Sequence, residues 1–284
     1  MDKTRKAKLV AYQEKLSALK FLDPACGSGN FLTETYLSLR RLENEVLSTL
    51  SHGQIAFGDA NINPIEVSIG QFYGIEINDF AVTVAKTAMW IAESQMLKET
   101  EDVVHMNLDF LPLKSYANIH EGNALQVDWE TVVPKHELNY IMGNPPFVGL
   151  SLRTAEQQED MKNVFSDNDR AGRLDYVAAW YKKACEYSES TAIECAFVST
   201  NSITQGEQVP ILWDDLIMQH GIIINYAYRT FTWNNESKGK AAVFCVIIGF
   251  SHIPRKTKQI FTYNNIGKTK IAQDVDYING YLVN

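Results

Sequence analysis

The sequence predicts an α/β fold built on a mostly parallel sheet, and three observations support this. Apolar runs bounded by turn residues alternate with amphipathic stretches along most of the chain, which is the pattern of strands and covering helices. The chain has 284 residues, 45% of them hydrophobic, enough to bury one large core. The apolar runs at 222–229 and 241–250 are joined by a polar stretch too short for a helix. These two runs therefore predict an antiparallel hairpin that closes the sheet.

Seven strands and three helices are expected in total. The strands are apolar, β-branched runs at 19–25, 71–77, 117–123, 138–144, 193–200, 222–229 and 241–250. The helices are expected at 30–50, 78–97 and 174–188, where apolar residues recur every three or four positions, such as Leu32, Tyr36, Leu39 and Val46 in the first and Tyr176, Ala179, Trp180 and Ala184 in the third. Asn78, directly after a strand, is the expected N-cap of the second helix, and Asp175 is that of the third.

Two stretches carry weaker patterns. The polar stretch 153–175 is either a mobile segment that contacts substrate or a plain solvent-exposed connector. After Pro254 only "KQIFTY" is strand-like. We therefore expect a main domain over 1–253 and a C-terminal extension over 254–284.

Composition excludes several classes of protein. No run of eighteen apolar residues occurs and charges interrupt the N-terminal stretch, so we expect neither a membrane span nor a secretory signal, and a cytoplasmic protein. The four cysteines lie far apart without a C-x-x-C pair, and the six histidines show no ligand spacing, so we expect free thiols and no metal site. The net charge of −8 argues against nucleic acid, but lysine and arginine gather from Arg229 onward. That basic stretch is either a partner surface or simply solvated.

A glycine-containing turn joins the first strand to the first helix. "FLDPACGSGNFL" at 21–32 places glycines at 27 and 29, where missing Cβ atoms let backbone N–H groups approach a ligand. Leu32 replaces the last glycine of a nicotinamide-dinucleotide fingerprint, so that cofactor is not indicated. Taken alone, the two glycines also suit a purely structural tight turn.

Polar residues end the next strands and favour a nucleoside ligand. Glu76 ends the second strand, where a carboxylate can accept both hydroxyl hydrogens of a ribose. A solvated strand-end carboxylate is the alternative. After the third strand, Asn123 can pair with an adenine edge and Ala124 can lie against its face. We expect one site along the rim of the sheet, formed by Asp23, Gly27, Glu76, Asn123 and Asn144.

Four motifs resemble those of the gamma group of adenine-N6 DNA methyltransferases, which belong to the class I S-adenosylmethionine-dependent methyltransferases. They are "DPACGSGNF" at 23–31, "GIEIN" at 74–78, "GNAL" at 122–125 and "GNPPF" at 143–147. The "DW" at 128–129 and the stretch 230–250 resemble more narrowly the methyltransferase region of MmeI-like type IIL restriction-modification enzymes. The resemblance implies a Rossmann-like, doubly wound, three-layer α/β/α fold with a seven-stranded sheet. An N-P-P-[FY] motif alone also occurs in enzymes that methylate release-factor glutamine or ribosomal RNA guanine.

The resemblance implies S-adenosylmethionine as methyl donor and double-stranded DNA as substrate. The cofactor-binding residues are then expected to be Asp23, Pro24, Ala25, Gly27, Gly29, Asn30, Phe31, Glu76, Ile77, Asn123 and Ala124. Catalytic residues are expected at Asn144, Pro145, Pro146 and Phe147. An aromatic at the first helical turn, such as Phe31, also suits plain packing.

The chemistry of the last motif follows from the weakness of the adenine amine as a nucleophile, because its lone pair is delocalised into the ring. If the side-chain oxygen of Asn144 and the carbonyl of Pro145 each accept one N6–H, the lone pair is localised and turned toward the methyl donor. Pro145 and Pro146 fix φ, so the acceptors are aimed before the substrate arrives. Phe147 can stack on the base, a contact worth about 1–3 kcal/mol.

An adenine inside a duplex cannot reach such a turn, so it must be flipped out at a cost of a few kcal/mol. In the resembled family a second aromatic wall comes from the segment before the late hairpin, which here offers Phe231 and Trp233. We prefer Phe231 for stacking on the base, and packing within the hairpin is the alternative role for either ring.

The resemblance also sets the expected partners. MmeI-like enzymes join this core to a target-recognition region and an endonuclease region, and no nuclease motif stands out here. We therefore expect a catalytic fragment whose extension leads toward a target-recognition region. The alternatives are a methyltransferase acting on RNA or on protein glutamine, and a non-catalytic module that docks cofactor or DNA.

Overall fold

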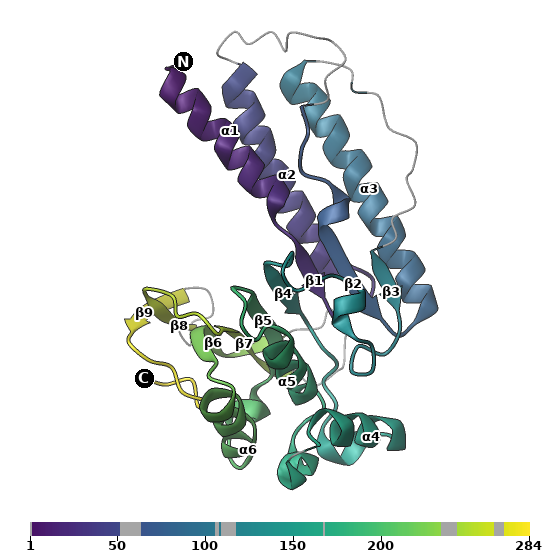
Figure 1. Cartoon of the computed structure of the whole chain (residues 1–284), viewed down its shortest axis with the longest axis vertical. Coiled ribbons are helices and arrows are strands. Elements are labelled where there is room, and N and C mark those ends of the chain that lie inside the picture. The colour runs from purple at the N-terminus through teal and green to yellow at the C-terminus, as the bar shows by residue number, and fades with distance from the viewer. Residues whose placement is uncertain are drawn as a thin grey trace. The chain divides into compact units, whose positions relative to one another are not determined.

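The computed structural model describes residues 2–51, 64–105, 108, 118–166, 168–233, 243–263 and 270–284. The chain divides into two compact units, Met1–Gly122 and Asn123–Asn284. Each unit has strands and helices of its own, which are labelled in Figure 1.

The described part of the first unit contains three strands and three long helices (Figure 1). The strands are β1 (Phe21–Asp23), β2 (Phe72–Glu76) and β3 (Ile119–Glu121), and the helices are α1 (Lys3–Ala18), α2 (Asn30–Ser51) and α3 (Asp79–Val104). β2 lies between β1 and β3 and runs parallel to both. Asp23 pairs with Gly74, two residues before Glu76, so β1 and β2 end at the same edge.

Close packing holds the helices of the first unit against its strands. The Phe72 ring is fully buried, stacks on Phe21 with 5.2 Å between ring centroids and meets Tyr36 of α2 edge-on at 5.7 Å. Gly29, directly before α2, has a φ of +83°, and a Cβ added to it would lie 3.1 Å from the Cβ of Ala85 in α3. Position 29 therefore requires glycine for both its backbone conformation and its close neighbour.

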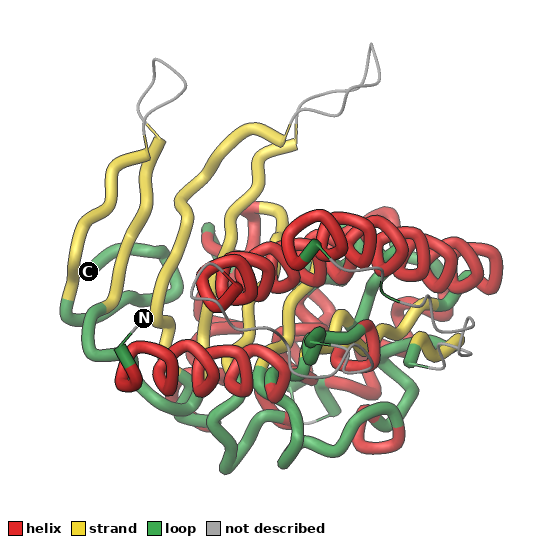
Figure 2. The backbone as a smooth tube through the Cα atoms, turned by 90° about the horizontal axis from the view of Figure 1, so that it is seen from above, coloured by secondary structure: helices red, strands yellow, loops and turns green. Residues whose placement is uncertain are grey.

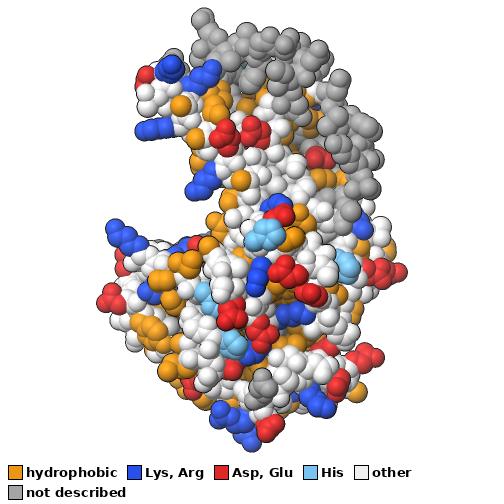
Figure 3. Space-filling view, viewed as in Figure 1, with side chains coloured by type: hydrophobic (Ala, Val, Ile, Leu, Met, Phe, Trp, Pro, Cys, Tyr) orange, Lys and Arg blue, Asp and Glu red, His pale blue; other side chains and the backbone are white. Residues whose placement is uncertain are grey.

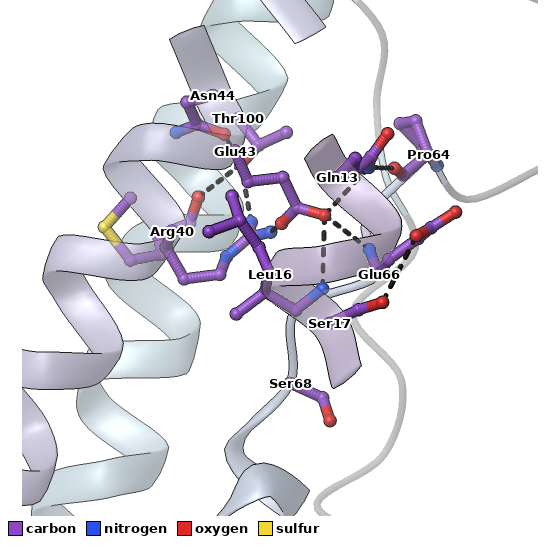
Figure 4. A network of polar contacts seen from close by, with 12 residues as sticks. Gln13, Leu16, Ser17, Arg40, Glu43, Asn44, Pro64, Glu66, Ser68 and Thr100 are labelled. Atoms are coloured by element: carbon purple, nitrogen blue, oxygen red, sulfur yellow. Dashed lines mark hydrogen bonds and ion pairs between the residues drawn. The ribbon is translucent and has the colours of Figure 1, made fainter. Parts of the chain in front are cut away.

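A buried polar network links the three helices of the first unit (Figure 4). Glu43 of α2 is fully buried and accepts hydrogen bonds from Nε2 of Gln13 in α1 at 2.8 Å and from the Glu66 N–H at 2.7 Å. The same carboxylate pairs with Arg40, whose guanidinium also donates to the Thr100 hydroxyl of α3 at 2.7 Å. Buried charges persist only with such partners. The network therefore fastens α1 to the unit, although only two residues of that helix are buried.

The described part of the second unit contains six strands and three α-helices. The strands are β4 (Tyr140–Gly143), β5 (Glu194–Thr200), β6 (Ile223–Trp233), β7 (Val243–Ser251), β8 (Lys258–Tyr263) and β9 (Lys270–Val275). The helices are α4 (Ala155–Val164), α5 (Ala178–Tyr187) and α6 (Gln208–Asp214), and a π-helical turn, Asp215–Gln219, continues α6. Short 3₁₀ turns lie at Ile69–Gln71 in the first unit and at Trp129–Thr131, Leu150–Leu152, Asp169–Arg173 and Asn201–Thr204 in the second.

The strands of the second unit are hydrogen-bonded in the order β4, β5, β7, β6, β8, β9. β5 is parallel to β4, whereas β7 is antiparallel to both β5 and β6, and Figure 2 shows strands of this region running side by side in yellow. The fully buried Tyr181 ring of α5 packs on Phe197 of β5 and Phe250 of β7, at 5.3 and 5.5 Å between ring centroids. These aromatic contacts fix α5 against the sheet.

The predicted mixed α/β fold is confirmed, with nine strands in the described residues instead of the predicted seven. All seven predicted strands and all three predicted helices form, β6 and β7 make the predicted antiparallel pair, and β8 coincides with "KQIFTY". The N-cap role of Asn78 is confirmed, since its side chain accepts the Ala81 N–H at 2.9 Å. β9 and the helices α1, α4 and α6 were not predicted. The boundary at 253/254 stays a prediction.

Candidate active site

The glycine turn of the first unit is built around a buried carboxylate. Asp23, at the end of β1, is 1% exposed, and its Oδ1 accepts the Ala25 N–H at 3.0 Å. The turn then passes through Gly27 and Gly29 with φ values of +53° and +83°, which glycine adopts without steric cost. A Cβ added at Gly27 would meet no atom within 4 Å, so the missing side chain leaves open space above the turn.

Glu76 joins this turn to the end of β2. Its Oε2 accepts the Gly27 N–H at 2.9 Å, and its Oε1 accepts the Asn78 N–H at 2.9 Å. Each carboxylate oxygen has two lone pairs, so one on each oxygen remains for a ligand hydroxyl. The side chains of Ile77 and Phe80 just beyond are 68% and 74% exposed. Exposed apolar side chains beside a half-free carboxylate suit the base and the ribose of a nucleoside.

Burial of the Asp23 carboxyl raises its pKa. Loss of solvation raises the pKa of the Asp23 carboxyl to about 7, the Ala25 N–H opposes this shift, and the nearby Glu76 charge adds to it. Ionised Asp23 is therefore costly in the absence of a cation. A positively charged ligand over the turn would offset that cost.

The other predicted residues of this turn lie around the same backbone. Pro24 is buried, Ala25 and Phe31 are half-buried, and Asn30 is exposed and accepts a hydrogen bond from the Ser28 hydroxyl at 3.4 Å. Phe31 lies in the first turn of α2. The first unit thus brings together the residues predicted for the cofactor from Asp23 to Ile77.

Asn123 belongs to the second unit and is held by a residue that the sequence analysis did not single out. Its Oδ1 accepts the Leu125 N–H at 3.0 Å, and its Nδ2 donates to Oδ2 of Asp160 at 2.9 Å. Ala124 is 5% exposed, and its carbonyl accepts the Trp129 indole N–H at 2.9 Å. The loop after β3 is therefore rigidly braced, with the Asn123 amide in a fixed orientation.

The turn predicted to be catalytic directly follows β4. The Asn144 side-chain oxygen is buried and accepts no hydrogen bond from the described residues. Pro145 is buried, Pro146 is exposed and Phe147 is half-buried. A buried amide oxygen without a donor is costly, by about 1–3 kcal/mol, and this cost is recovered when a ligand supplies the donor. The Asn144 oxygen is therefore a buried acceptor without a donor among the described residues, and the two prolines after it restrict the backbone of this turn.

The segment 153–175 is neither a plain connector nor extended chain. It forms α4, whose N-cap Thr154 makes a capping box with Gln157, and a 3₁₀ turn at Asp169–Arg173. Arg153 is 8% exposed, donates to the Gly172 carbonyl and lines a cavity of about 650 Å³ in this segment, and its Nε has no partner among the described residues. Burial lowers the pKa of the Arg153 guanidinium.

The predicted N-cap role of Asp175 is wrong. α5 begins only at Ala178, and the Asp175 carboxylate instead accepts hydrogen bonds from the hydroxyls of Ser202 and Thr200, at the end of β5. Its own N–H donates to Oε1 of Gln208 at 2.9 Å. Hydroxyl donors from a segment distant in sequence outcompete the helix terminus, which a local capping pattern cannot reveal.

Phe231 and Trp233 lie near the end of β6 and are both half-buried. The Phe231 ring packs against Trp233 at 6.2 Å and Tyr263 of β8 at 5.9 Å between ring centroids. Phe231 thus has aromatic neighbours and an exposed portion, and the stacking role stays a prediction.

The predicted basic surface is only partly described. Lys238, Lys240 and Lys268 lie outside the described residues. Arg229 donates to the Leu282 carbonyl at 2.9 Å, and Arg255 pairs with Glu194. On the face in Figure 3, lysine and arginine side chains are interspersed with aspartate and glutamate. Charge in the described residues therefore does not by itself mark a nucleic-acid surface.

Sequence reasoning missed Asp160 and Tyr176, which form one hydrogen-bonded cluster with the predicted residue Asn123. Tyr176 appeared only as part of an apolar stripe, and Asp160 is one of many polar residues in its segment. Asp160 accepts from Asn123, 37 residues away, and from Tyr176, 16 residues away, and no local pattern in the sequence encodes these bonds. The four cysteines are free, as predicted, and all four are buried. In the described ranges no group of His, Cys, Asp and Glu is arranged to hold a metal, and no helix there is long and apolar enough to span a membrane.

Comparison with known proteins identifies a matching family and several similar proteins. The family model described as the MmeI DNA-methyltransferase domain matches residues 1–262. DNA methyltransferase A of Bacillus subtilis (strain 168) is 42% identical over 271 residues, which are 91% of this chain and 30% of that protein. The DNA-bound structure of the type IIL restriction-modification enzyme MmeI superimposes with a TM-score of 0.91 at 45% identity, over 98% of this chain and 37% of that one.

A more distant neighbour shows the fold alone. The DNA-bound type ISP restriction-modification enzyme LlaBIII has a TM-score of 0.50 at 14% identity, over 86% of this chain and 17% of that one. The chain spans about a third of the length of its two nearer relatives. The predicted resemblance is confirmed, and the chain belongs to the family of MmeI DNA-methyltransferase domains.

Proposed function

We propose that this chain is the catalytic domain of a DNA methyltransferase that moves a methyl group from S-adenosylmethionine to the N6 amine of an adenine flipped out of duplex DNA. One observation carries the proposal, the buried Asn144 oxygen that has no donor in the described residues and directly precedes two prolines. A fixed acceptor without a donor suits a substrate that brings an N–H.

The first unit would hold the cofactor. The free lone pairs of Glu76 fit the two ribose hydroxyls, and the exposed Ile77 and Phe80 offer apolar cover for the adenine. Open space above Gly27 leaves room for the methionine portion, and Asp23 supplies negative charge toward its cationic groups. When bound, the cofactor supplies an electrophilic methyl group on a sulfonium.

Asn144 and Pro145 would activate the amine. Their oxygens accept the two N6–H groups, so that the nitrogen lone pair points away from the ring. A nitrogen–carbon bond then forms while the carbon–sulfur bond breaks and its electron pair stays on sulfur. The extra N6 proton becomes acidic only after transfer and leaves to solvent, so no general base is needed for the attack. Fixed acceptors of this type contribute about 10²–10³ to rate.

Phe147 and Phe231 would bind the everted ring by stacking. Phe147 is half-buried directly after the prolines, and Phe231 is half-buried near the end of β6. Stacking on aromatic side chains, about 1–3 kcal/mol per base, offsets part of the cost of leaving the duplex. Target recognition and any nuclease activity would belong to other regions of the longer protein.

A tritium-transfer assay with the full-length protein tests this proposal. Labelled S-adenosylmethionine is offered with unmethylated duplex DNA, ribosomal RNA or release factor, and we expect label on DNA alone. Asn144→Ala is expected to lower the rate by about 10²–10³, while the matched control Asn163→Ala, at an exposed asparagine of α4, leaves it unchanged. Label on RNA or protein, or an Asn144→Ala rate within a few-fold of the wild type, contradicts the proposal.

A further inference from the structure

Asp160 is a buried carboxylate at the centre of a polar cluster in the second unit. It lies on α4 and is 3% exposed. Its Oδ2 accepts the Nδ2–H of Asn123 at 2.9 Å and the Tyr176 hydroxyl at 2.7 Å, and its Oδ1 accepts the Nε2–H of Gln126 at 2.9 Å. Three donors from two separate segments thus meet on one side chain. Charged acceptors make shorter and stronger hydrogen bonds than neutral ones.

This cluster decides which way the Asn123 amide faces. An amide has a donor end and an acceptor end, and the carboxylate admits only the donor end. The Leu125 N–H holds the acceptor end at 3.0 Å. One N–H and one lone pair of Asn123 therefore remain, in fixed directions. A ring nitrogen and an amine of adenine require that combination of one donor and one acceptor.

The cluster also reaches the turn predicted to be catalytic. Tyr176 donates its hydroxyl to Asp160 and its backbone N–H to the Val148 carbonyl, at 2.9 Å. Val148 directly follows Phe147. The same tyrosine thus ties the segment that carries Asn144 to the carboxylate that orients Asn123.

We infer that Asp160 is a positioning residue for methyl transfer: it holds the Asn123 amide in the orientation that can pair with an adenine edge and, through Tyr176, fixes the turn that activates the substrate amine. This inference rests on the proposed function and deepens it. Asp160 touches neither cofactor nor substrate and acts only through its neighbours. A merely structural carboxylate would affect folding stability, but its effect would not depend on the identity of the side chain at position 123.

Substitutions at positions 160 and 123, made singly and together, test the inference. In Asp160→Asn an amide N–H₂ faces the donors of Asn123 or Gln126, and we expect the dissociation constant for S-adenosylmethionine, measured by calorimetry on the full-length protein, to rise by about tenfold or more. Asn123→Asp sets two carboxylates against each other and should weaken binding similarly. In an Asn123→Ala background, where the amide that Asp160 orients is absent, Asp160→Asn should change the dissociation constant by less than about threefold.

Two further variants distinguish a positioning role of Asp160 from a general loss of stability around α4. Tyr176→Phe removes only the hydroxyl, so we expect cofactor binding within about threefold of the wild type and a single-turnover methylation rate, at saturating cofactor, reduced about five- to tenfold. Thr154→Ala removes the N-cap of α4 without touching the cluster and should leave cofactor binding within about twofold.

The outcomes distinguish this inference from the proposed function. If wild-type protein binds S-adenosylmethionine and methylates DNA, but Asp160→Asn does so equally well, the inference is overturned and the proposed function stands. An effect of Asp160→Asn that is as large in the Asn123→Ala background as in the wild type, or a Thr154→Ala effect as large as that of Asp160→Asn, also overturns it. If wild-type protein does not bind S-adenosylmethionine, both fail together.

Discussion

Replacing Asp23 by asparagine should change the pH dependence of folding in a way that can be calculated from its burial. The carboxyl is 1% exposed, and its pKa rises from 3.8 to about 7 in the folded chain. An acid whose pKa is raised by folding binds its proton more tightly in the native state. Its effect on stability is therefore absent at low pH, and stability is lost as the pH rises from 3.8 toward the folded value.

The size of the effect follows from the two pKa values. They differ by about three pH units, and each unit corresponds to about 1.4 kcal/mol, so ionising Asp23 costs about 4 kcal/mol at alkaline pH. More than half of that cost develops between about pH 5 and about pH 8. Asparagine carries no charge, so Asp23→Asn should gain about that much stability relative to the wild type across the interval.

Urea denaturation of both proteins at the two pH values measures this difference. The matched control is Glu34→Gln on α2, at a carboxylate that is 69% exposed and should show no such dependence. A stability difference between Asp23→Asn and the wild type that is the same at both pH values would contradict a raised pKa for the Asp23 carboxyl. A direct nuclear magnetic resonance titration of the Asp23 carboxyl near pH 4 would refute it as well.

Three other substitutions test packing and substrate binding. Glu43→Gln breaks a buried ion pair and should lower the free energy of unfolding by about 3–5 kcal/mol in urea denaturation, and a loss below about 1 kcal/mol would contradict the role of the network. Gly29→Ala should cost about 1–3 kcal/mol more than Gly27→Ala by the same measurement, because only position 29 also has a close neighbour; equal losses would contradict this. Phe231→Ala should lower kcat/KM for DNA methylation by about 10–100-fold, and a larger loss for Trp233→Ala would reverse the assignment.

The fold was predictable wherever one short segment carried its own pattern. Strands such as β2 and β4 are apolar runs that end at polar turn residues, and α2 has an apolar stripe. By contrast, α1 and α4 bury few apolar side chains and are held instead by polar contacts such as that of Glu43 with Gln13. β9 alternates weakly, and its pairing with β8 places it in the sheet. Such elements are stabilised by contacts with distant segments, which the local sequence pattern does not reveal.

In the candidate site, too, some residues were predictable from the local sequence and others were not. Glu76 was predicted because it ends a strand, and its bond to the Gly27 N–H agrees with the expected meeting of the two strand ends. Asp160 could not be predicted, since its donors come from two other segments and a polar residue in a polar stretch carries no distinguishing pattern. The N-cap prediction for Asp175 was wrong for the same reason. Its carboxylate accepts from the hydroxyls of Thr200 and Ser202, which lie beyond the helix that Asp175 precedes.

The identity of the methylated nucleoside would show whether Asn144 activates an adenine amine. Unmethylated duplex DNA is incubated with the full-length protein and S-adenosylmethionine, digested to nucleosides and analysed by mass spectrometry. We expect N6-methyladenine from the wild type and its loss from Asn144→Ala. Methylcytosine as the product, or N6-methyladenine at an undiminished level from Asn144→Ala, would contradict the claim that the oxygen of Asn144 activates an adenine amine.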